Sequence, residues 1–524
     1  MRKRATRHLI ASVALAVLWS SKATSSYVQL PQFRAGVALT RVEVRVVDSA
    51  GYPVRDLTRD EFVLREDGYE QEIAHFQAVS FDGVPELVAA PRMFLIVLGR
   101  GQLEAPTKTL RALTDFVRSK CLPADRVGVV AYLRAIEFTT NHEAVARFLE
   151  TFRGRHEAID SKIARDLKTS AMAPDTRASI DALFRDDGLQ VRDLAAGAGN
   201  NVLRFSDFRF LKAALEYLSV IDGEKHAVFV TQRPFINIAQ ANTPAQNYWI
   251  RQATSARTTL SFIHAGGLKA EPANATKFSR PESPLGFDPG FIDDQEWMAN
   301  QTGGTATFFQ FGDKPLTALD RATRAHYVLG YYPSRAVSPE QYRNIEVTVK
   351  RADVRPLYRH GYVAQPRPEE PQDYRRAVTD ARLTEGAFRL VDPFPTTSPA
   401  MGFKLGMTLK VPSGTSLPTQ GPMPAIVSFD PSWVYFRQES AAYVAELDLR
   451  LLADDAQRKI VGEINEQLTF RLTADEFERS QRRLRPQSLT FDVVIKVKAR
   501  PAHLRGVLYQ FDSDRTASAQ VHLK

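Results

Sequence analysis

The chain has 524 residues, which at roughly 100 to 200 residues per domain allows two to four domains. Hydrophobic residues account for 44% and charged residues for 25%, close to the globular average, so the composition excludes a disordered chain and a polytopic membrane protein. The net charge of +9 at pH 7 would suit a nucleic-acid partner, but only if the basic residues belong to the folded protein.

The basic excess is concentrated at the N-terminus. A basic segment from Arg2 to Arg7 is followed by an apolar run from Leu9 to Trp19 and then by Ser21-Lys22-Ala23, which is the order of a secretory signal peptide and its cleavage site. The apolar run is shorter than the about 20 residues that span a bilayer. Residues 1–23 carry five Lys and Arg and no acidic residue, so cleavage lowers the net charge from +9 to +4.

These features predict an exported protein, periplasmic or extracellular, with no integral-membrane segment after signal cleavage and no nucleic-acid partner. Because Lys22 is unusual inside a cleavage site, an uncleaved anchor is the alternative. The single cysteine, Cys121, excludes an intramolecular disulfide and lies on the apolar face of an expected helix. We therefore expect a buried structural thiol at this position.

Residues 37–85 form an expected N-terminal β-module. Val42, Val44 and Val46 alternate with charged residues in the pattern of a half-buried strand, which directs those charged residues to solvent. The Asp67-Gly68 pair suits a hairpin turn, because both central positions of such a turn need a positive φ.

Residues 88–325 change to alternating strands and helices, the pattern of a doubly wound α/β domain with a mainly parallel sheet. A capping box at Thr140 opens one helix, which we expect to end at Gly154. Residues 155–205 are polar and yield no predicted structure. The expected strands are 93–98, 126–133, 226–231, 258–264 and 305–311, and the expected helices are 107–120, 140–154, 206–218, 245–256, one around Trp297 and one from Asp313.

The remainder of the chain is predicted to be mostly β-structure. Residues 326–364 return to alternation, and we hypothesise that segments 37–80 and 327–364 pair into one β-sandwich with the α/β domain inserted between them. A proline-rich linker is expected at 365–375 and a C-terminal β-sandwich-like domain at 376–524. Its expected strands are 407–411, 442–452, 467–472, 489–497 and 507–511, with one helix at 474–483.

Local catalytic motifs are absent from the sequence. There is no GxxxxGK[ST] phosphate loop, no GxSxG elbow and no GxGxxG after the first α/β strand. His142-Glu143 begins like a zinc-protease helix, but the position four residues after the histidine is Ala146. The sequence therefore predicts no catalytic residue, no metal site and no cofactor.

In a doubly wound sheet, ligands bind outside the carboxyl ends of the strands. The first α/β strand is followed by Gly99, Arg100, Gly101 and Gln102, and the strand at 226 ends at Thr231 and is followed by Gln232 and Arg233. We take these seven residues as the candidate partner-binding surface.

Several segments, in this order, resemble the exported, acidobacterial-type von Willebrand factor A-related family. VRDLTRDEF and YVLGYYP are the more specific of them, and together the segments frame about 320 residues. The resemblance implies a von Willebrand factor A-like α/β domain. The segments are VEVRVVDSAGYPVRDLTRDEFVLREDGYEQEIAHFQAV, LPADRVGVVAYL, QTGGTATFF, HYVLGYYP and IEVTVKRADVRPLYRHGYVA.

The resemblance also indicates a degenerate metal-ion-dependent adhesion site. Such domains often bind Mg²⁺ through Asp-x-Ser-x-Ser after the first strand and a second Asp elsewhere; here the matching residues are 99–103 and Gln232, with no carboxylate. Arg100 and Arg233 would also repel a dication at short range. They would instead suit a carboxylate or phosphate on a partner, although solvated loop arginines are the alternative.

We therefore expect a non-catalytic protein that binds another protein or a cell-envelope component. The alternatives are an envelope hydrolase whose active site combines residues distant in sequence, and a structural or assembly component of the envelope. We expect Tyr327 and Tyr331 to pack inward rather than form a recognition strip. The basic cluster of Arg479, Arg482, Arg483 and Arg485 is expected to be a solvated helix end rather than a polyanion site.

Overall fold

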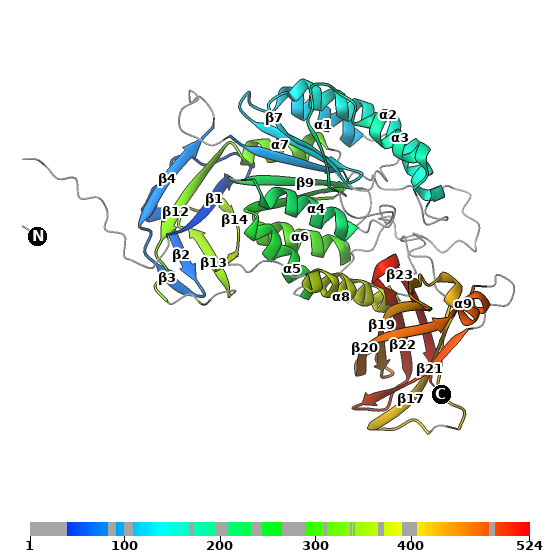
Figure 1. Cartoon of the computed structure of the whole chain (residues 1–524). Helices are drawn as coiled ribbons and strands as arrows, with labels where there is room; N and C mark the ends of the chain where they lie inside the picture. Colours follow the sequence, from blue (N-terminus) through cyan, green and yellow to red (C-terminus); the bar gives the residue numbers. More distant parts are fainter. Residues whose placement is uncertain are drawn as a thin grey trace, which may run out of the picture. The chain divides into compact units, whose positions relative to one another are not determined.

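The computed structural model forms one compact unit from Leu39 onward (Figure 1). The predicted signal peptide, residues 1–23, lies outside the described residues. No helix in the described part of the chain is both long and apolar enough to cross a membrane. The structure describes residues 39–81, 91–98, 108–166, 172–194, 207–221, 223–231, 244–264, 290–308, 312–335, 338, 341–364, 371–389, 406–414, 416–481 and 488–523.

Segments from either side of the α/β domain pair with each other in two four-stranded sheets. Val44 lies opposite Tyr327 in one sheet, and Leu64 lies opposite Val347 in the other. The contacts that the β-sandwich hypothesis requires are therefore present. One sheet has the order β14 (Val354–Tyr358), β1 (Thr40–Asp48), β12 (Ala325–Tyr331) and β4 (His75–Ser80); the other has β15 (Gly361–Val363), β13 (Tyr342–Val349), β2 (Phe62–Glu66) and β3 (Tyr69–Gln71), with a 3-10 turn at Arg59–Glu61.

Both tyrosines on the inner face of β12 are buried between these sheets. The Tyr327 hydroxyl donates to the Val54 carbonyl at 2.9 Å. The Tyr331 hydroxyl donates to the Glu66 carboxylate, which also pairs with Arg343. Packing of the two rings against the domain, as the alternation predicted, is thus confirmed.

The α/β domain contains a seven-stranded sheet. Its first five strands in space run parallel, and β7 is antiparallel to β6. Tyr132 and Leu133 both have positive φ in the two-residue turn between β6 and β7, so β6 ends two residues before the predicted strand end. The order is β11 (Ala306–Thr307), β10 (Thr258–His264), β9 (Lys225–Thr231), β5 (Met93–Leu98), β6 (Arg126–Ala131), β7 (Arg134–Thr139) and β8 (Val191–Asp193).

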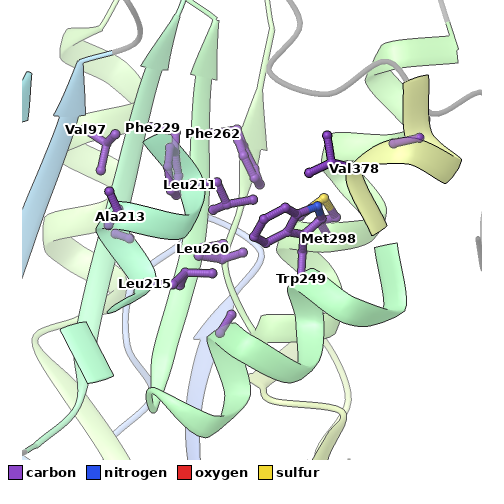
Figure 2. Packing of buried hydrophobic residues seen from close by; sticks show 14 of the residues in the cluster. Val97, Leu211, Ala213, Leu215, Phe229, Trp249, Leu260, Phe262, Met298 and Val378 are labelled. Atoms are coloured by element: carbon purple, nitrogen blue, oxygen red, sulfur yellow. The ribbon is translucent and has the colours of Figure 1, made fainter. Parts of the chain in front are cut away.

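Helices cover both faces of this sheet (Figure 1). Along β5, Ile96 belongs to the apolar cluster with Leu113, whereas Val97 belongs to the cluster with Leu211, because successive strand residues point to opposite faces. Figure 2 shows Leu211, Trp249 and Met298 gathered beside Phe229 and Phe262. One face carries α1 (Lys108–Ser119), α2 (His142–Asp166), α3 (Pro174–Leu183) and α7 (Asp313–Ala322); the other carries α4 (Asp207–Ser219), α5 (Pro244–Ser255) and α6 (Gly290–Thr302).

One sequence prediction in this domain is wrong, a segment left without a prediction holds regular structure, and one expected strand is described only in part. Gly154 does not end its helix: α2 continues to Asp166, since a glycine costs an exposed helix interior only about 1 kcal/mol. The segment 155–205 is not without structure, because it holds the end of α2 together with α3 and β8. The strand expected at 305–311 is described only as Ala306–Thr307, with residues 309–311 outside the described part.

The C-terminal part begins earlier than predicted. Helix α8 spans Pro371–Arg389, so residues 371–375 of the expected linker are helical, and residues 365–370 lie outside the described residues. Pro371 suits a first helical position because its φ is fixed near the helical value, and Asp373 favours the first turn.

The C-terminal strands follow one antiparallel order, in which two groups of strands are joined, within the described residues, only by the pairing of Gly462 with Val497. The strand Gly421–Phe429 was not predicted because it contains Pro422 and Pro424. These prolines lie outside the four residues of this strand that pair with the strand Met407–Lys410, so their missing N–H groups leave no hydrogen bond unmade on that side. The strands are β16 (Met407–Lys410), β17 (Gly421–Phe429), β21 (Leu489–Val497), β20 (Ile460–Thr473), β19 (Ala442–Asp454), β22 (His503–Gln510) and β23 (Arg515–His522), with β18 (Arg437–Glu439) on β19, helix α9 (Ala474–Ser480) and 3-10 turns at Pro431–Trp433 and Phe511–Ser513.

Helix α8 contacts both the α/β domain and the C-terminal sheet. Tyr374 makes edge-to-face contacts with Trp249 of α5 and with Phe511 after β22. Near the other end of the helix, Arg505 donates to the Ala387 carbonyl at 2.6 Å and forms two hydrogen bonds, of 2.6 and 2.8 Å, with Asp454. The buried pair of Arg505 and Asp454 therefore fixes the end of α8 on the sheet.

We expect Arg505→Met to lower the free energy of unfolding by about 3–5 kcal/mol, because it leaves the fully buried Asp454 carboxylate without its cation. Urea unfolding followed by circular dichroism measures the change. Arg471→Met is the matched control, since Arg471 lies on the same sheet, is 66% exposed and pairs with Glu439 only at 3.6 Å. Equal losses for the two variants would show that the buried pair does not stabilise the sheet.

Candidate functional site

The carboxyl ends of β5 and β9 lie side by side at one edge of the seven-stranded sheet. The two strands are parallel neighbours, with Leu98 opposite Val230. Along the chain they are the first and fifth strands of this sheet, and the chain order reverses between them, because β6 lies on the far side of β5 and β10 on the far side of β9. Such a reversal is the switch point at which doubly wound sheets bind ligands.

Of the seven residues of the candidate partner-binding surface, Thr231 lies within the described residues. Thr231 is the last residue of β9 and lies opposite His264 of β10. The other six residues, Gly99, Arg100, Gly101, Gln102, Gln232 and Arg233, lie outside the described residues. Of the basic cluster, Arg479 lies on α9 and donates to the Asp475 carbonyl at 3.2 Å, while Arg482, Arg483 and Arg485 lie outside the described residues.

Tyr132 is a described polar side chain at the same edge, directly after β6. Its hydroxyl lies 3.0 Å from Asp160 Oδ1 and 3.3 Å from the His156 carbonyl, both on α2. Burial, followed by the Asp160 charge, raises the pKa of Tyr132, so its hydroxyl stays protonated. In the described part of the chain, no group of three or more His, Cys, Asp or Glu side chains is placed to hold a metal ion.

The opposite, amino-terminal edge of the sheet contacts the β-sandwich through charged residues. Arg45 of β1 donates to the Gly303 carbonyl at 2.6 Å and to Thr259 Oγ1 at 3.3 Å. Arg359, between β14 and β15, donates to both oxygens of Glu224 at 2.6 and 2.7 Å. The Arg45 residue is 8% exposed, and the Arg359 and Glu224 side chains are 14% and 21% exposed, so these contacts form a largely enclosed joint.

Two carboxyl groups in this joint take opposite protonation states. Burial, and then the charge of Glu224, raises the pKa of Glu43 to about 9, so Glu43 is protonated at neutral pH and hydrogen-bonds to Glu224. Burial opposes ionisation of Glu224, but the Arg359 charge and the hydrogen bond from Glu43 hold its pKa below the usual value. Burial lowers the pKa of His326 to about 4 and lowers that of His226, so both imidazoles are neutral.

A second enclosed charge cluster lies at the same edge, under β5. Arg92 donates to both carboxylate oxygens of Asp125 at 3.0 and 2.5 Å, to Asp320 Oδ1 at 3.1 Å and to Thr323 Oγ1 at 2.9 Å. The Arg92 side chain is 1% exposed. Its positive charge is therefore committed to joining the starts of β5 and β6 to the end of α7.

The sequence analysis missed the charged joint. Alternation along β1 directed Glu43 and Arg45 to solvent, and the structure contradicts this for Arg45, which is buried. The reason is that the second face of β1 packs against the α/β domain rather than facing water. A signal was present in the two opposite charges on one strand face, but their partners Glu224 and Arg359 are far away in sequence.

Cys121 is half-buried, packs against the apolar cluster of α1 and α2, and is free. Burial, with a contribution from the Asp125 charge, raises the pKa of its thiol to about 12. The thiol therefore stays protonated and behaves as a structural side chain.

Comparisons with known proteins do not assign this chain to a family. No family model matches the chain, and no curated protein matches it. Among solved structures, a beta-glucuronidase from glycoside hydrolase family 2 is similar over 22% of this chain and 11% of that chain, with 10% identity and a TM-score of 0.14. The human COPII-coat protein Sec24c is similar over 60% of this chain and 50% of that chain, with 9% identity and a TM-score of 0.25. The chain therefore covers at most half the length of these two proteins.

We expect the free energy of unfolding of Glu43→Gln to rise relative to that of the unchanged protein as the pH rises. Between about pH 4.5 and 9, folded Glu43 keeps a proton that the unfolded chain has lost, so its contribution to the free energy of unfolding falls with rising pH, by at most about 1.4 kcal/mol per pH unit. Glutamine keeps a donor for Glu224 and does not ionise. Urea unfolding at a series of pH values from about 5 to 8.5 measures the difference.

The control for this pH series is Glu70→Gln, because Glu70 is on β3 of the same β-sandwich and is 69% exposed. Its stability difference from the unchanged protein should vary little over the same pH range. If the curves for Glu43→Gln and the unchanged protein run parallel, Glu43 is not protonated in the joint. The neutral imidazoles His226 and His326 are present in both proteins, so their own pH dependence largely cancels.

Proposed function

We propose that this protein is an exported, non-catalytic binding protein whose α/β domain recognises another protein or a cell-envelope component in the periplasm or outside the cell. The observation that carries the proposal is the parallel pairing of β5 with β9, which brings the ends of both strands to one switch point. The resemblance of the sequence to von Willebrand factor A-related proteins supports the same location for the surface.

The chemistry of the proposed surface is cationic. Arg100 follows Leu98 by two residues and Arg233 follows Thr231 by two residues, while residues 99–103 and 231–233 contain no Asp or Glu. A guanidinium group can bind a carboxylate or phosphate with two parallel hydrogen bonds. The partner we propose therefore presents a carboxylate or phosphate at the contact, and binding does not require a divalent cation there.

The charged joint supports this assignment because it occupies the opposite edge of the sheet. Arg45, Glu224 and Arg359 fix the β-sandwich at the amino-terminal ends of the strands. This joint leaves the carboxyl ends of β5 and β9 for recognition. A rigid sheet edge with a fixed support is a suitable base for binding loops.

Capture of partners from periplasmic extract on immobilised mature protein tests the proposal. We expect one or a few species to be retained by the unchanged protein, to be lost with the double variant Arg100→Glu and Arg233→Glu, and to be released as salt rises, because exposed ion pairs are screened. Retention in EDTA is expected because the proposed surface has no carboxylate ligands. The identified species is then titrated against both proteins by calorimetry.

The matched control is Arg471→Glu combined with Arg479→Glu, which reverses two charges on the C-terminal sheet and α9. This variant should retain the same species with the same affinity. Equal capture by the double variant at Arg100 and Arg233 would contradict the assigned surface. Loss of capture in EDTA would contradict the metal-independent mode, and turnover of the captured species would favour the hydrolase alternative.

A further inference from the structure

Two histidines face each other across the last two strands of the C-terminal sheet. His503 begins β22 and lies directly opposite His522 of β23, and its neighbour on the other side is Asp454 of β19. The imidazole centres are 4.7 Å apart, with 49° between the ring planes. Residues directly opposite each other in a sheet share a face, so both rings belong to one side of the sheet. His522 is exposed and His503 is half-buried.

The His503 ring presents an unused nitrogen lone pair. The His503 ring also hydrogen-bonds to the backbone of Asp455. Nδ1 is enclosed and has no hydrogen-bond partner, so the N–H is on Nε2. A backbone carbonyl that holds the second nitrogen is the usual support of a metal-binding histidine.

The neighbouring charges are already committed. Asp454 forms its two hydrogen bonds with Arg505, and Asp455 accepts from the backbone N–H groups of Gln457 and Lys459 at 2.9 Å each. These carboxylates therefore balance the nearby cations rather than point to a hard, oxygen-rich site. Arg458 is a cationic neighbour that disfavours added positive charge at His503. The available ligands are two imidazoles, which suit Cu²⁺, Ni²⁺ and Zn²⁺ and do not suit Mg²⁺ or Ca²⁺.

The separation of the rings fits one shared ion. Two imidazole nitrogens at about 2.0 to 2.1 Å from one ion place their ring centres roughly 4.5 to 5.5 Å apart. An isolated stacked pair would instead leave the enclosed Nδ1 unsatisfied. We propose that His503 and His522 form a transition-metal site with two protein ligands, in which water fills the remaining positions. The order of affinity is Cu²⁺ above Ni²⁺ and Zn²⁺, and the site is independent of the candidate partner-binding surface.

Calorimetry with CuCl₂ and with ZnCl₂, on the full mature chain without a polyhistidine tag, tests this site. We expect one equivalent of Cu²⁺ to bind, with electron paramagnetic resonance showing coupling to two imidazole nitrogens. His503→Gln and His522→Gln should each weaken this step by at least about tenfold, and the double variant should abolish it. Circular dichroism checks that the variants keep their fold.

The control variant is His75→Gln, because His75 is exposed on β4 of the β-sandwich. This variant should bind Cu²⁺ as the unchanged protein does. The proposal is overturned if the unchanged protein takes up no equivalent of Cu²⁺, or if the double variant at His503 and His522 retains the same stoichiometry and affinity. A signal from a single nitrogen in the unchanged protein, with the affinity kept in His522→Gln, would also overturn it, because it would assign the ion to one histidine alone.

Discussion

Charge pairs enclosed between the β-sandwich and the α/β domain set the geometry of this protein. Taking a guanidinium group out of water costs several kcal/mol, and the cost is offset only when the carboxylate and carbonyl partners are correctly placed. Arg45 and Arg359 meet this condition at the amino-terminal edge of the sheet. A small displacement of the β-sandwich would separate these partners. The joint therefore fixes one position of the inserted α/β domain on the β-sandwich, in addition to stabilising it.

The insertion itself follows from strand pairing. Ser80, at the end of β4, lies opposite Ala325, at the start of β12, so the chain leaves the β-sandwich and returns to it at neighbouring positions. An α/β domain entered and left at one point could rotate about that point. The charged joint and the packing of β1 against the sheet oppose such rotation. The amino-terminal edge is thereby used for support, and the proposed recognition surface is at the other end of the same strands.

Elements whose residues meet a single kind of environment could be predicted from the sequence. Residues 93–98 are apolar throughout because helices cover both faces of β5. Charged residues with distant partners could not be predicted in this way. The pattern of β1 indicates that Arg45 is exposed to solvent, and its burial is explained only by its hydrogen bonds to Gly303 and Thr259. The prolines of β17 likewise concealed a strand, because proline is disfavoured in a strand only where a neighbouring strand needs its N–H group.

The candidate surface could be predicted to the same extent. Strand ends at a switch point follow from topology, and topology follows from the order of strands and helices, so the sequence predicted that Thr231 ends a strand at the carboxyl edge of the sheet. The joint of Glu43 and Glu224 could not be predicted, since residues 181 positions apart carry no local sign of contact. The same holds for the opposed pair of His503 and His522, which depends on the register of β22 with β23.

The joint also changes how the basic composition is interpreted. Arg45, Arg92, Arg343, Arg359 and Arg505 are committed to carboxylates or backbone carbonyls inside the fold. Their charges are neutralised locally and contribute little to the field that an approaching polyanion would meet. A high isoelectric point is therefore weak evidence for polyanion binding here, and recognition of an acidic partner has to rest on a few arginines placed at a defined edge of the sheet, as in the surface proposed around Arg100 and Arg233.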